Sequence, residues 1–167
     1  MTVSVLFVCL GNICRSPTAD GVLRQRIAEA GWADVVRVDS AGTGDWHLGK
    51  GPDPRSTAAA RERGYDLSSL RARQVSAEDF AAFDYVLAMD RSNLDALRAM
   101  CPAQYTGHLS LFLDFHPRRG ADGIPEEVPD PYYGDEHGFP QVLDLVEAAC
   151  DGLLAHLADR YRLPARP

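Results

Sequence analysis

Long hydrophobic runs are missing from this sequence of 167 residues. The longest apolar stretch, residues 3–10, is interrupted by Ser4 and is much shorter than the roughly 20 residues that cross a membrane as a helix. It also lacks the basic flank and the length of a secretory signal peptide. We therefore expect a cytoplasmic protein without a membrane segment.

Cysteine is scarce, and its spacing does not suit metal binding. The four cysteines are Cys9, Cys14, Cys101 and Cys150. They form no Cys-x-x-Cys pair, and the five histidines are scattered, so neither a zinc site nor an iron–sulfur site is indicated. Because cytoplasmic thiols stay reduced, we expect no disulfide framework.

An excess of positive charge is also absent, since the formal net charge is −7 at pH 7. Nucleic-acid binding depends largely on basic surface, so we expect no nucleic-acid partner. Hydrophobic residues make up 46% of the chain and charged residues 25%, which is ordinary for a globular protein. The length suits one compact domain covering residues 1–167.

What is present is an alternation of strand-like and helix-like segments. The apolar, β-branched patterns predict strands at residues 3–8, 35–38, 85–88 and 108–112. Helical spacing and end signals predict helices at residues 17–30, 55–63, 77–83, 91–100 and 141–161. This alternation predicts an α/β fold, a four-stranded parallel sheet with helices on both faces in three layers.

The most informative segment, residues 9–17, reads Cys-Leu-Gly-Asn-Ile-Cys-Arg-Ser-Pro. It joins the first predicted strand to a helix that we expect to begin at Pro17, with Ser16 as its cap. Open α/β sheets bind their ligands at the carboxyl ends of strands. A loop that enters a helix there turns several backbone N–H groups toward one point, where they and the helix dipole favour an anion.

Two side chains of this segment predict phosphoryl chemistry. A cysteine at such a point, here Cys9, is held as the nucleophilic thiolate, and the planar fork of Arg15 can pair two phosphoryl oxygens at once. Gly11 allows the backbone to approach the ligand closely. Cys9 alone could be a buried structural residue, but the surrounding residues favour the catalytic interpretation.

Two aspartates come later in the chain, and their spacing leaves two interpretations of each open. Asp130 lies between Pro129 and Pro131, which stiffen it as a candidate general acid; it could equally be a turn residue. Asp90 follows the third predicted strand at the same sheet edge as Cys9. It could organise Arg15 or cap the helix that starts at residue 91.

Residues 9–17 together with residues 130–134, Asp-Pro-Tyr-Tyr-Gly, resemble the signature loop and the acid loop of the low-molecular-weight protein tyrosine phosphatases. Residues 39–44, 52–55, 72–74 and 89–93 resemble the landmarks between them. The likeness runs from about residue 5 to about residue 157 in matching order and spacing. It implies a protein-tyrosine-phosphatase that acts on phosphotyrosine-containing proteins and releases inorganic phosphate without a metal or other cofactor.

The resemblance also implies roles for individual residues. Cys9 would form a phosphocysteine intermediate, Arg15 would bind the phosphate, and Asp130 would serve as general acid and then as general base. The remaining members of the phosphate-binding loop would be Leu10, Gly11, Asn12, Ile13, Cys14 and Ser16.

Residues around this loop would support it and select the substrate. Ser16 would donate a hydrogen bond to the Cys9 thiolate, and Asn12 would hold the shape of the loop by bonding to Ser40. The aromatic rim, which would select the long phosphotyrosine over phosphoserine, would consist of Trp46, Tyr132 and Tyr133.

Cys14 resembles the second loop cysteine of the family, which implies that it could trap oxidised Cys9 as a disulfide. One departure is visible at Leu70, where many members carry a histidine. A pKa-tuning role tied to that histidine would be lost here. We expect the protein to be a monomer.

Three other functions share parts of this pattern. Protein arginine phosphatases resemble this loop but carry threonine where this chain has Ile13, and the bulkier side chain favours phosphotyrosine. Arsenate reductases of the same fold need further cysteines after the second helix, and residues 65–100 contain none. A non-catalytic phosphate-binding module would not need the nucleophile and the acid, yet both are present.

Overall fold

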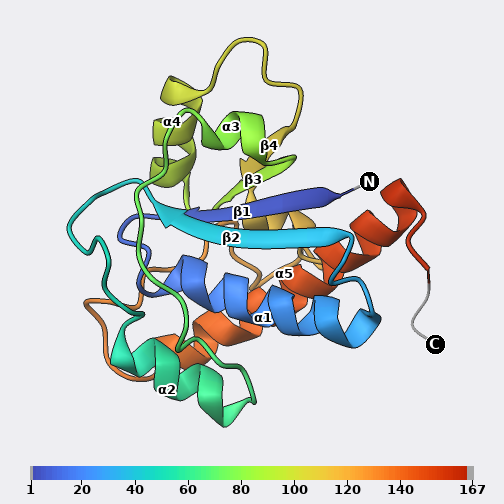
Figure 1. Cartoon of the computed structure of the whole chain (residues 1–167). Coiled ribbons are helices and arrows are strands. Elements are labelled where there is room, and N and C mark those ends of the chain that lie inside the picture. The colour runs from blue at the N-terminus through green and yellow to red at the C-terminus, as the bar shows by residue number, and fades with distance from the viewer. Residues whose placement is uncertain (1, 165–167) are drawn as a thin grey trace.

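Four parallel strands form the centre of the protein in the computed structural model, which describes residues 2–164 (Figure 1). They are β1 (Val3–Cys9), β2 (Val36–Gly42), β3 (Tyr85–Ala88) and β4 (His108–Leu111). Their order across the sheet is β2-β1-β3-β4. The predicted four-stranded parallel sheet is therefore confirmed.

Helices cover both faces of this sheet, as predicted (Figure 1). One layer holds α1 (Arg15–Ala30), α2 (Pro54–Glu62) and α5 (Gly138–Tyr161), and the other holds α3 (Asp79–Ala82) and α4 (Arg91–Met100). A short 3₁₀ helix, η1 (Phe112–Phe115), follows β4. Within residues 2–164, no helix is long and apolar enough to cross a membrane.

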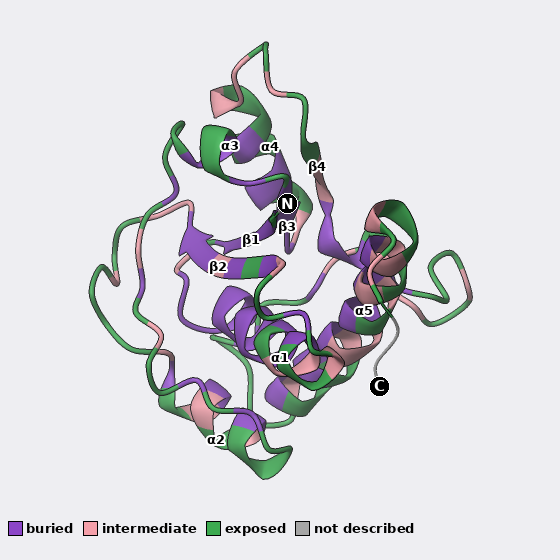
Figure 2. Cartoon of the chain, turned by 45° about the vertical axis from the view of Figure 1, so that its right-hand side comes forward, coloured by how far each residue is buried: buried purple, intermediate pink, exposed green. Residues whose placement is uncertain are grey.

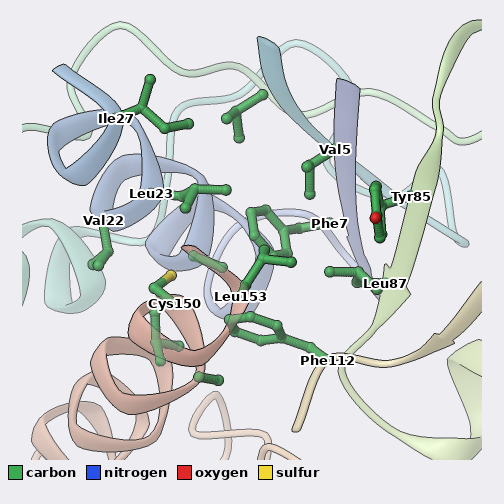
Figure 3. Packing of buried hydrophobic residues seen from close by; sticks show 14 of the residues in the cluster. Val5, Phe7, Val22, Leu23, Ile27, Tyr85, Leu87, Phe112, Cys150 and Leu153 are labelled. Carbon is green, nitrogen blue, oxygen red and sulfur yellow. The ribbon is translucent and has the colours of Figure 1, made fainter. Parts of the chain in front are cut away.

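The two faces of β1 supply two separate hydrophobic cores. Every residue of β1 is buried, which explains its nearly unbroken apolar sequence (Figure 2). Val5 and Phe7 point toward α1 and α5, where the Phe7 ring meets Phe112 edge to face with the ring centroids 4.9 Å apart (Figure 3). Leu6 and Val8 belong to the core on the side of α3 and α4.

The start of α1 differs from the prediction in a way that matters for function. The helix begins at Arg15 rather than Pro17, and Cys14 occupies the cap position without a side-chain capping bond. Pro17 is tolerated in the first turn because the first N–H groups of a helix have no partner within it. Ser16 is consequently a buried first-turn residue rather than the cap, which leaves its hydroxyl free to act elsewhere.

Other boundaries shift for tertiary reasons. β2 begins at residue 36 and continues to Gly42, four residues beyond the predicted end, because residues 39–42 pair with residues 6–9 of β1 despite their weak intrinsic strand preference. β4 ends one residue early, because Phe112 already starts η1. The helix predicted at residues 77–83 is reduced to residues 79–82, that at 55–63 is shifted to 54–62, and α5 begins at residue 138 instead of 141.

Candidate active site

A pocket of about 310 Å³ opens at the carboxyl end of β1. β1 is one of the two central strands, and the carboxyl end of such a strand is where an open α/β sheet places a ligand. Its lining brings Cys9, Arg15 and Asp130 together, as predicted. The other lining residues are Leu10, Gly11, Ile13, Cys14, Trp46, His47, Tyr132 and Tyr133.

The phosphate loop, residues 9–16, is held in shape from inside by Asn12. This residue is buried and has a φ of 57°, in the left-handed region that asparagine tolerates better than most residues. Its side-chain amide donates to Ser16 Oγ at 2.8 Å and to Ser40 Oγ at 3.0 Å, and its Oδ1 accepts the backbone N–H of Arg73 at 3.0 Å. The predicted bond between Asn12 and Ser40 is confirmed.

The Cys9 thiol sits at the last position of β1, almost fully buried. Its Sγ lies 3.0 Å from Ser16 Oγ, and the backbone N–H of Asn12 donates to it at 3.3 Å. Because a thiolate can only accept, these contacts stabilise the charged sulfur when the Ser16 hydroxyl points toward it. The Ser16 hydroxyl thus lies within hydrogen-bond distance of the sulfur, as the role implied for it by the resemblance requires.

Arg15 is positioned by three acceptors on later segments. Its Nη1 donates to Asp90 Oδ2 at 2.7 Å and to the Val128 carbonyl at 3.1 Å, while its Nη2 lies 3.5 Å from Asp130 Oδ2. Burial opposes the guanidinium charge, but the negative charges of Cys9, Asp90 and Asp130 outweigh it and raise the pKa of Arg15. A buried, permanently charged fork therefore faces the pocket.

Asp90 performs both of the roles that the sequence left open. Its Oδ2 binds Arg15, and its Oδ1 accepts the backbone N–H of Asn93 at 2.8 Å, which caps α4. One carboxylate thus fixes both the arginine and the helix that follows β3.

Asp130 lies in what we call the acid loop, residues 129–137, which leads into α5. Its side chain is about one-third exposed, and its Oδ1 accepts the backbone N–H of Tyr132 at 3.1 Å. The carboxyl group therefore reaches the pocket from a loop with no regular secondary structure. This placement suits a group that must meet both solvent and substrate.

The rim of the pocket is aromatic. Trp46, Tyr132 and Tyr133 all line it, with Trp46 and Tyr133 66% and 89% exposed. The ring centroid of Tyr132 lies 4.8 Å from that of Tyr133. His47 also lines the wall, with its ring 6.2 Å from that of Tyr132. Nothing in the sequence singles out His47 apart from its position next to Trp46.

Cys14 and Leu70, two positions singled out in the sequence, are both shielded from solvent to some degree. Cys14 is buried in the pocket wall, and burial raises the pKa of its thiol to about 12. Leu70, where the resemblance implies a histidine in many family members, packs half-buried against the core shared by α1 and α5. Cys101 is half-buried at the end of α4 and Cys150 is fully buried in α5, as expected of packing residues.

A buried thiol, an arginine fork and a carboxyl group around one helix N-terminus define the site of a cysteine-dependent phosphatase. Comparison with known proteins agrees with this class. The family described as low molecular weight phosphotyrosine protein phosphatase matches residues 4–163. The chain therefore belongs to the low-molecular-weight protein tyrosine phosphatase family.

Similar proteins come from organisms as different as Streptomyces, Entamoeba and Drosophila. A low molecular weight protein-tyrosine-phosphatase of Streptomyces coelicolor is 44% identical over 161 residues, which is 96% of each chain. A solved protein tyrosine phosphatase of Entamoeba histolytica is 40% identical with a TM-score of 0.87, covering 97% of this chain and 100% of that one. A Drosophila arginine phosphatase is 32% identical with a TM-score of 0.82, covering 91% and 96%. The predicted family, fold and protein-tyrosine-phosphatase activity are confirmed.

Proposed function

We propose that Cys9, Arg15 and Asp130 carry out the hydrolysis of phosphotyrosine in protein substrates through a phosphocysteine intermediate. The observation that supports this assignment is that all three side chains line one pocket at the N-terminus of α1. Phosphoprotein substrates follow from the family itself.

In the first step, the Cys9 thiolate attacks phosphorus while the bond from phosphorus to the phenolic oxygen breaks. Arg15 and the backbone N–H groups of the phosphate loop bind the oxygens on which negative charge is concentrated. Because the leaving phenol has a pKa near 10, protonated Asp130 donates its proton to the departing oxygen. The products of this step are phosphocysteine and the free tyrosine side chain.

In the second step, Asp130 accepts a proton from water as that water attacks phosphorus. The sulfur–phosphorus bond breaks, and inorganic phosphate leaves with the Cys9 thiolate restored. The Ser16 hydroxyl and the Asn12 N–H stabilise the departing sulfur through the contacts that they already make with it. Asp130 therefore changes from acid to base between the two steps.

The lining of the pocket favours a flat aromatic substrate. Trp46, Tyr132 and Ile13 present apolar surface to the ligand, and a short phosphoserine side chain would leave that surface unfilled. The resemblance to an arginine phosphatase keeps phosphoarginine as the second candidate. The apolar Ile13 in the wall is the feature that favours phosphotyrosine.

Further parts of the proposal extend the same assignment. Cys14 would trap oxidised Cys9 as a disulfide, a role supported by its place in the same pocket. A cytoplasmic location suits a nucleophile that must remain reduced. We further propose that one phosphatase domain occupies residues 1–167 and that the protein acts as a monomer.

The decisive measurement is phosphate release from matched peptides that carry phosphotyrosine, phosphoarginine or phosphoserine, without added metal. We expect the phosphotyrosine peptide to be turned over fastest, and Cys9→Ser to lower that turnover by more than about 10⁴-fold, because a serine hydroxyl stays protonated and is a much weaker nucleophile than a thiolate. Faster turnover of phosphoarginine would move the assignment to the sister activity. If none of the peptides is turned over, the proposed function is wrong, and arsenate reduction or simple phosphate binding becomes the next test.

A further inference from the structure

Arg55, in the first turn of α2, joins two loops of the pocket. Its guanidinium is fixed by Asp53, whose Oδ1 accepts Arg55 Nε at 3.1 Å and whose Oδ2 accepts Arg55 Nη2 at 2.9 Å. The same Nη2 donates to the backbone carbonyl of Tyr132 in the acid loop at 3.1 Å. The guanidinium carbon also lies 4.8 Å from the ring centroid of Phe139 at the start of α5, which holds the side chain in place by a cation–π contact.

The other end of this connection is the phosphate loop. The backbone N–H of Asp53 donates to the carbonyl of Ile13 at 2.8 Å, and the Asp53 carboxylate caps α2. Burial tends to raise the pKa of Asp53, but hydrogen bonds from Arg55 outweigh it and lower that pKa. The anchor of Arg55 is therefore charged and tied directly to the loop that carries the nucleophile.

The acid loop has few other attachments. Within residues 2–164, the bond from Arg55 to Tyr132 is the one hydrogen bond that joins residues 131–137 to any element other than α5. Pro129 and Pro131 have no N–H to offer. Asp130 itself accepts the N–H of Tyr132 and makes a long 3.5 Å contact with Arg15. Val128 anchors the chain before Asp130 through its bonds to Met89 and Arg15, and the N–H of Tyr132 holds the Asp130 carboxyl from the other side.

We propose that Arg55 is a positioning residue that places Asp130 for proton transfer by holding the main chain at Tyr132. This inference rests on the proposed role of Asp130 as general acid. Arg55 has no part in binding the phosphate, since its guanidinium is occupied by Asp53 and Tyr132 outside the loop of Cys9 and Arg15. Its removal should therefore weaken proton donation and leave phosphate binding unchanged.

The test compares two substrates that differ in their need for an acid. A phosphotyrosine peptide needs a proton on its leaving phenol, whereas 2,4-dinitrophenyl phosphate releases a stable anion. The ratio kcat/KM is the quantity to compare, because it reports the steps up to the first transfer. For Arg55→Met we expect kcat/KM to fall about 10–100-fold on the peptide and less than about threefold on the dinitrophenyl ester. The loss on the peptide would be a part of the full contribution that a general acid makes to the rate.

Matched control variants distinguish this positioning role from a general loss of structure. Arg61→Met removes an exposed arginine from the same helix and should leave both substrates unaffected. Inhibition by inorganic phosphate should be equal in Arg55→Met and the unaltered protein, which shows that the phosphate loop is intact. In Arg55→Met combined with Asp130→Asn, the loss on the peptide should match that of Asp130→Asn alone, because both changes disable one step.

The outcomes distinguish the two levels of the proposal. If Asp130→Asn lowers kcat/KM equally on both substrates, the proposed acid role of Asp130 is wrong. The role of Arg55 is wrong if Asp130→Asn lowers kcat/KM mainly on the peptide but Arg55→Met does not. It is also wrong if the losses of kcat/KM in the two single variants multiply in the double variant. Weaker inhibition by phosphate in Arg55→Met would likewise overturn it, because Arg55 would then act on the phosphate loop.

Discussion

The two loops that meet in the pocket are built on opposite principles. The phosphate loop is mostly buried. The side chain of Asn12 holds it from inside, and the backbone N–H groups of Thr43 and Gly44, just after β2, donate to the carbonyls of Cys9 and Leu10. The acid loop is largely exposed, and apart from the long contact between Asp130 and Arg15 it is held by one hydrogen bond from Arg55 and by its continuity with α5. In the proposed mechanism, the loop that stabilises a developing charge is largely buried, whereas the loop that exchanges protons with water is exposed to it.

This contrast predicts that the same small change will have different effects in the two loops. A Cβ at Gly42 would lie 2.7 Å from the Leu10 carbonyl oxygen and 3.1 Å from the Asn12 nitrogen, both backbone atoms of the phosphate loop. Because displacing catalytic groups by about 1 Å can cost about 100-fold, we expect Gly42→Ala to lower kcat/KM on phosphotyrosine by about that factor. Steady-state kinetics measures it.

The matched change in the acid loop is Gly134→Ala. A Cβ there meets nothing closer than the Pro131 carbonyl oxygen at 3.8 Å. We expect kcat/KM to stay within about twofold of the unaltered protein, in line with a typical surface substitution. If the two alanine variants lose activity equally, the difference in packing between the loops does not control catalysis.

Asn12 tests whether the rigid loop also contributes to overall stability. Asn12→Ala removes three hydrogen bonds and places alanine at a φ of 57°. We expect the free energy of unfolding to fall by about 2–4 kcal/mol and kcat/KM to fall by about tenfold. Urea unfolding and kinetics would measure the two effects.

Two comparisons sharpen this prediction. Asn12→Gly accepts the left-handed backbone and should recover about 1 kcal/mol of the loss, because only the hydrogen bonds are then missing. Tyr133→Ala in the acid loop removes a side chain that is 89% exposed and should change stability by less than about 0.5 kcal/mol. A loss for Tyr133→Ala as large as that for Asn12→Ala would contradict the contrast.

The burial of Cys14 in the phosphate loop should make the free energy of unfolding depend on pH in the alkaline range. We expect this effect to be smaller than that of Asn12→Ala. Burial raises the pKa of Cys14 in the folded protein from 9.0 to about 12. Above pH 9 the unfolded chain loses this proton while the folded protein keeps it, so the free energy of unfolding falls as the pH rises. Between pH 8 and pH 10 we expect Cys14 to account for a loss of about 1 kcal/mol.

Urea unfolding of Cys14→Ala under reducing conditions measures this contribution. The loss of stability between the two pH values should be smaller in Cys14→Ala than in the unaltered protein, whereas Gly134→Ala should follow the unaltered protein. Identical pH dependence in Cys14→Ala and the unaltered protein would mean that the Cys14 thiol is not shielded from ionisation.

The sequence revealed the parts of the site that are local in the chain. Cys9 and Arg15 lie six residues apart between a strand and a helix, so spacing alone places them around one anion. The same local signals predicted the parallel sheet. Asp130 could be named but its role could not be derived from spacing alone, because its approach to Arg15 depends on how a long loop folds back.

The remaining features are tertiary, and the sequence alone does not decide them. The double role of Asp90, the place of His47 in the wall and the bridge made by Arg55 each depend on contacts between distant segments. The extension of β2 to Gly42 likewise depends on pairing with β1, which outweighs the weak strand preference of its last residues.

The two tryptophans of the chain report on opposite ends of the molecule. Trp32 is buried near the start of β2, where its indole N–H donates to the Pro164 carbonyl at 2.8 Å. Trp46 stands exposed at the mouth of the pocket. Fluorescence quenching by a ligand in the pocket would thus arise from Trp46, while the red shift on unfolding would come mainly from Trp32. Binding and unfolding can therefore be followed optically in one unlabelled sample.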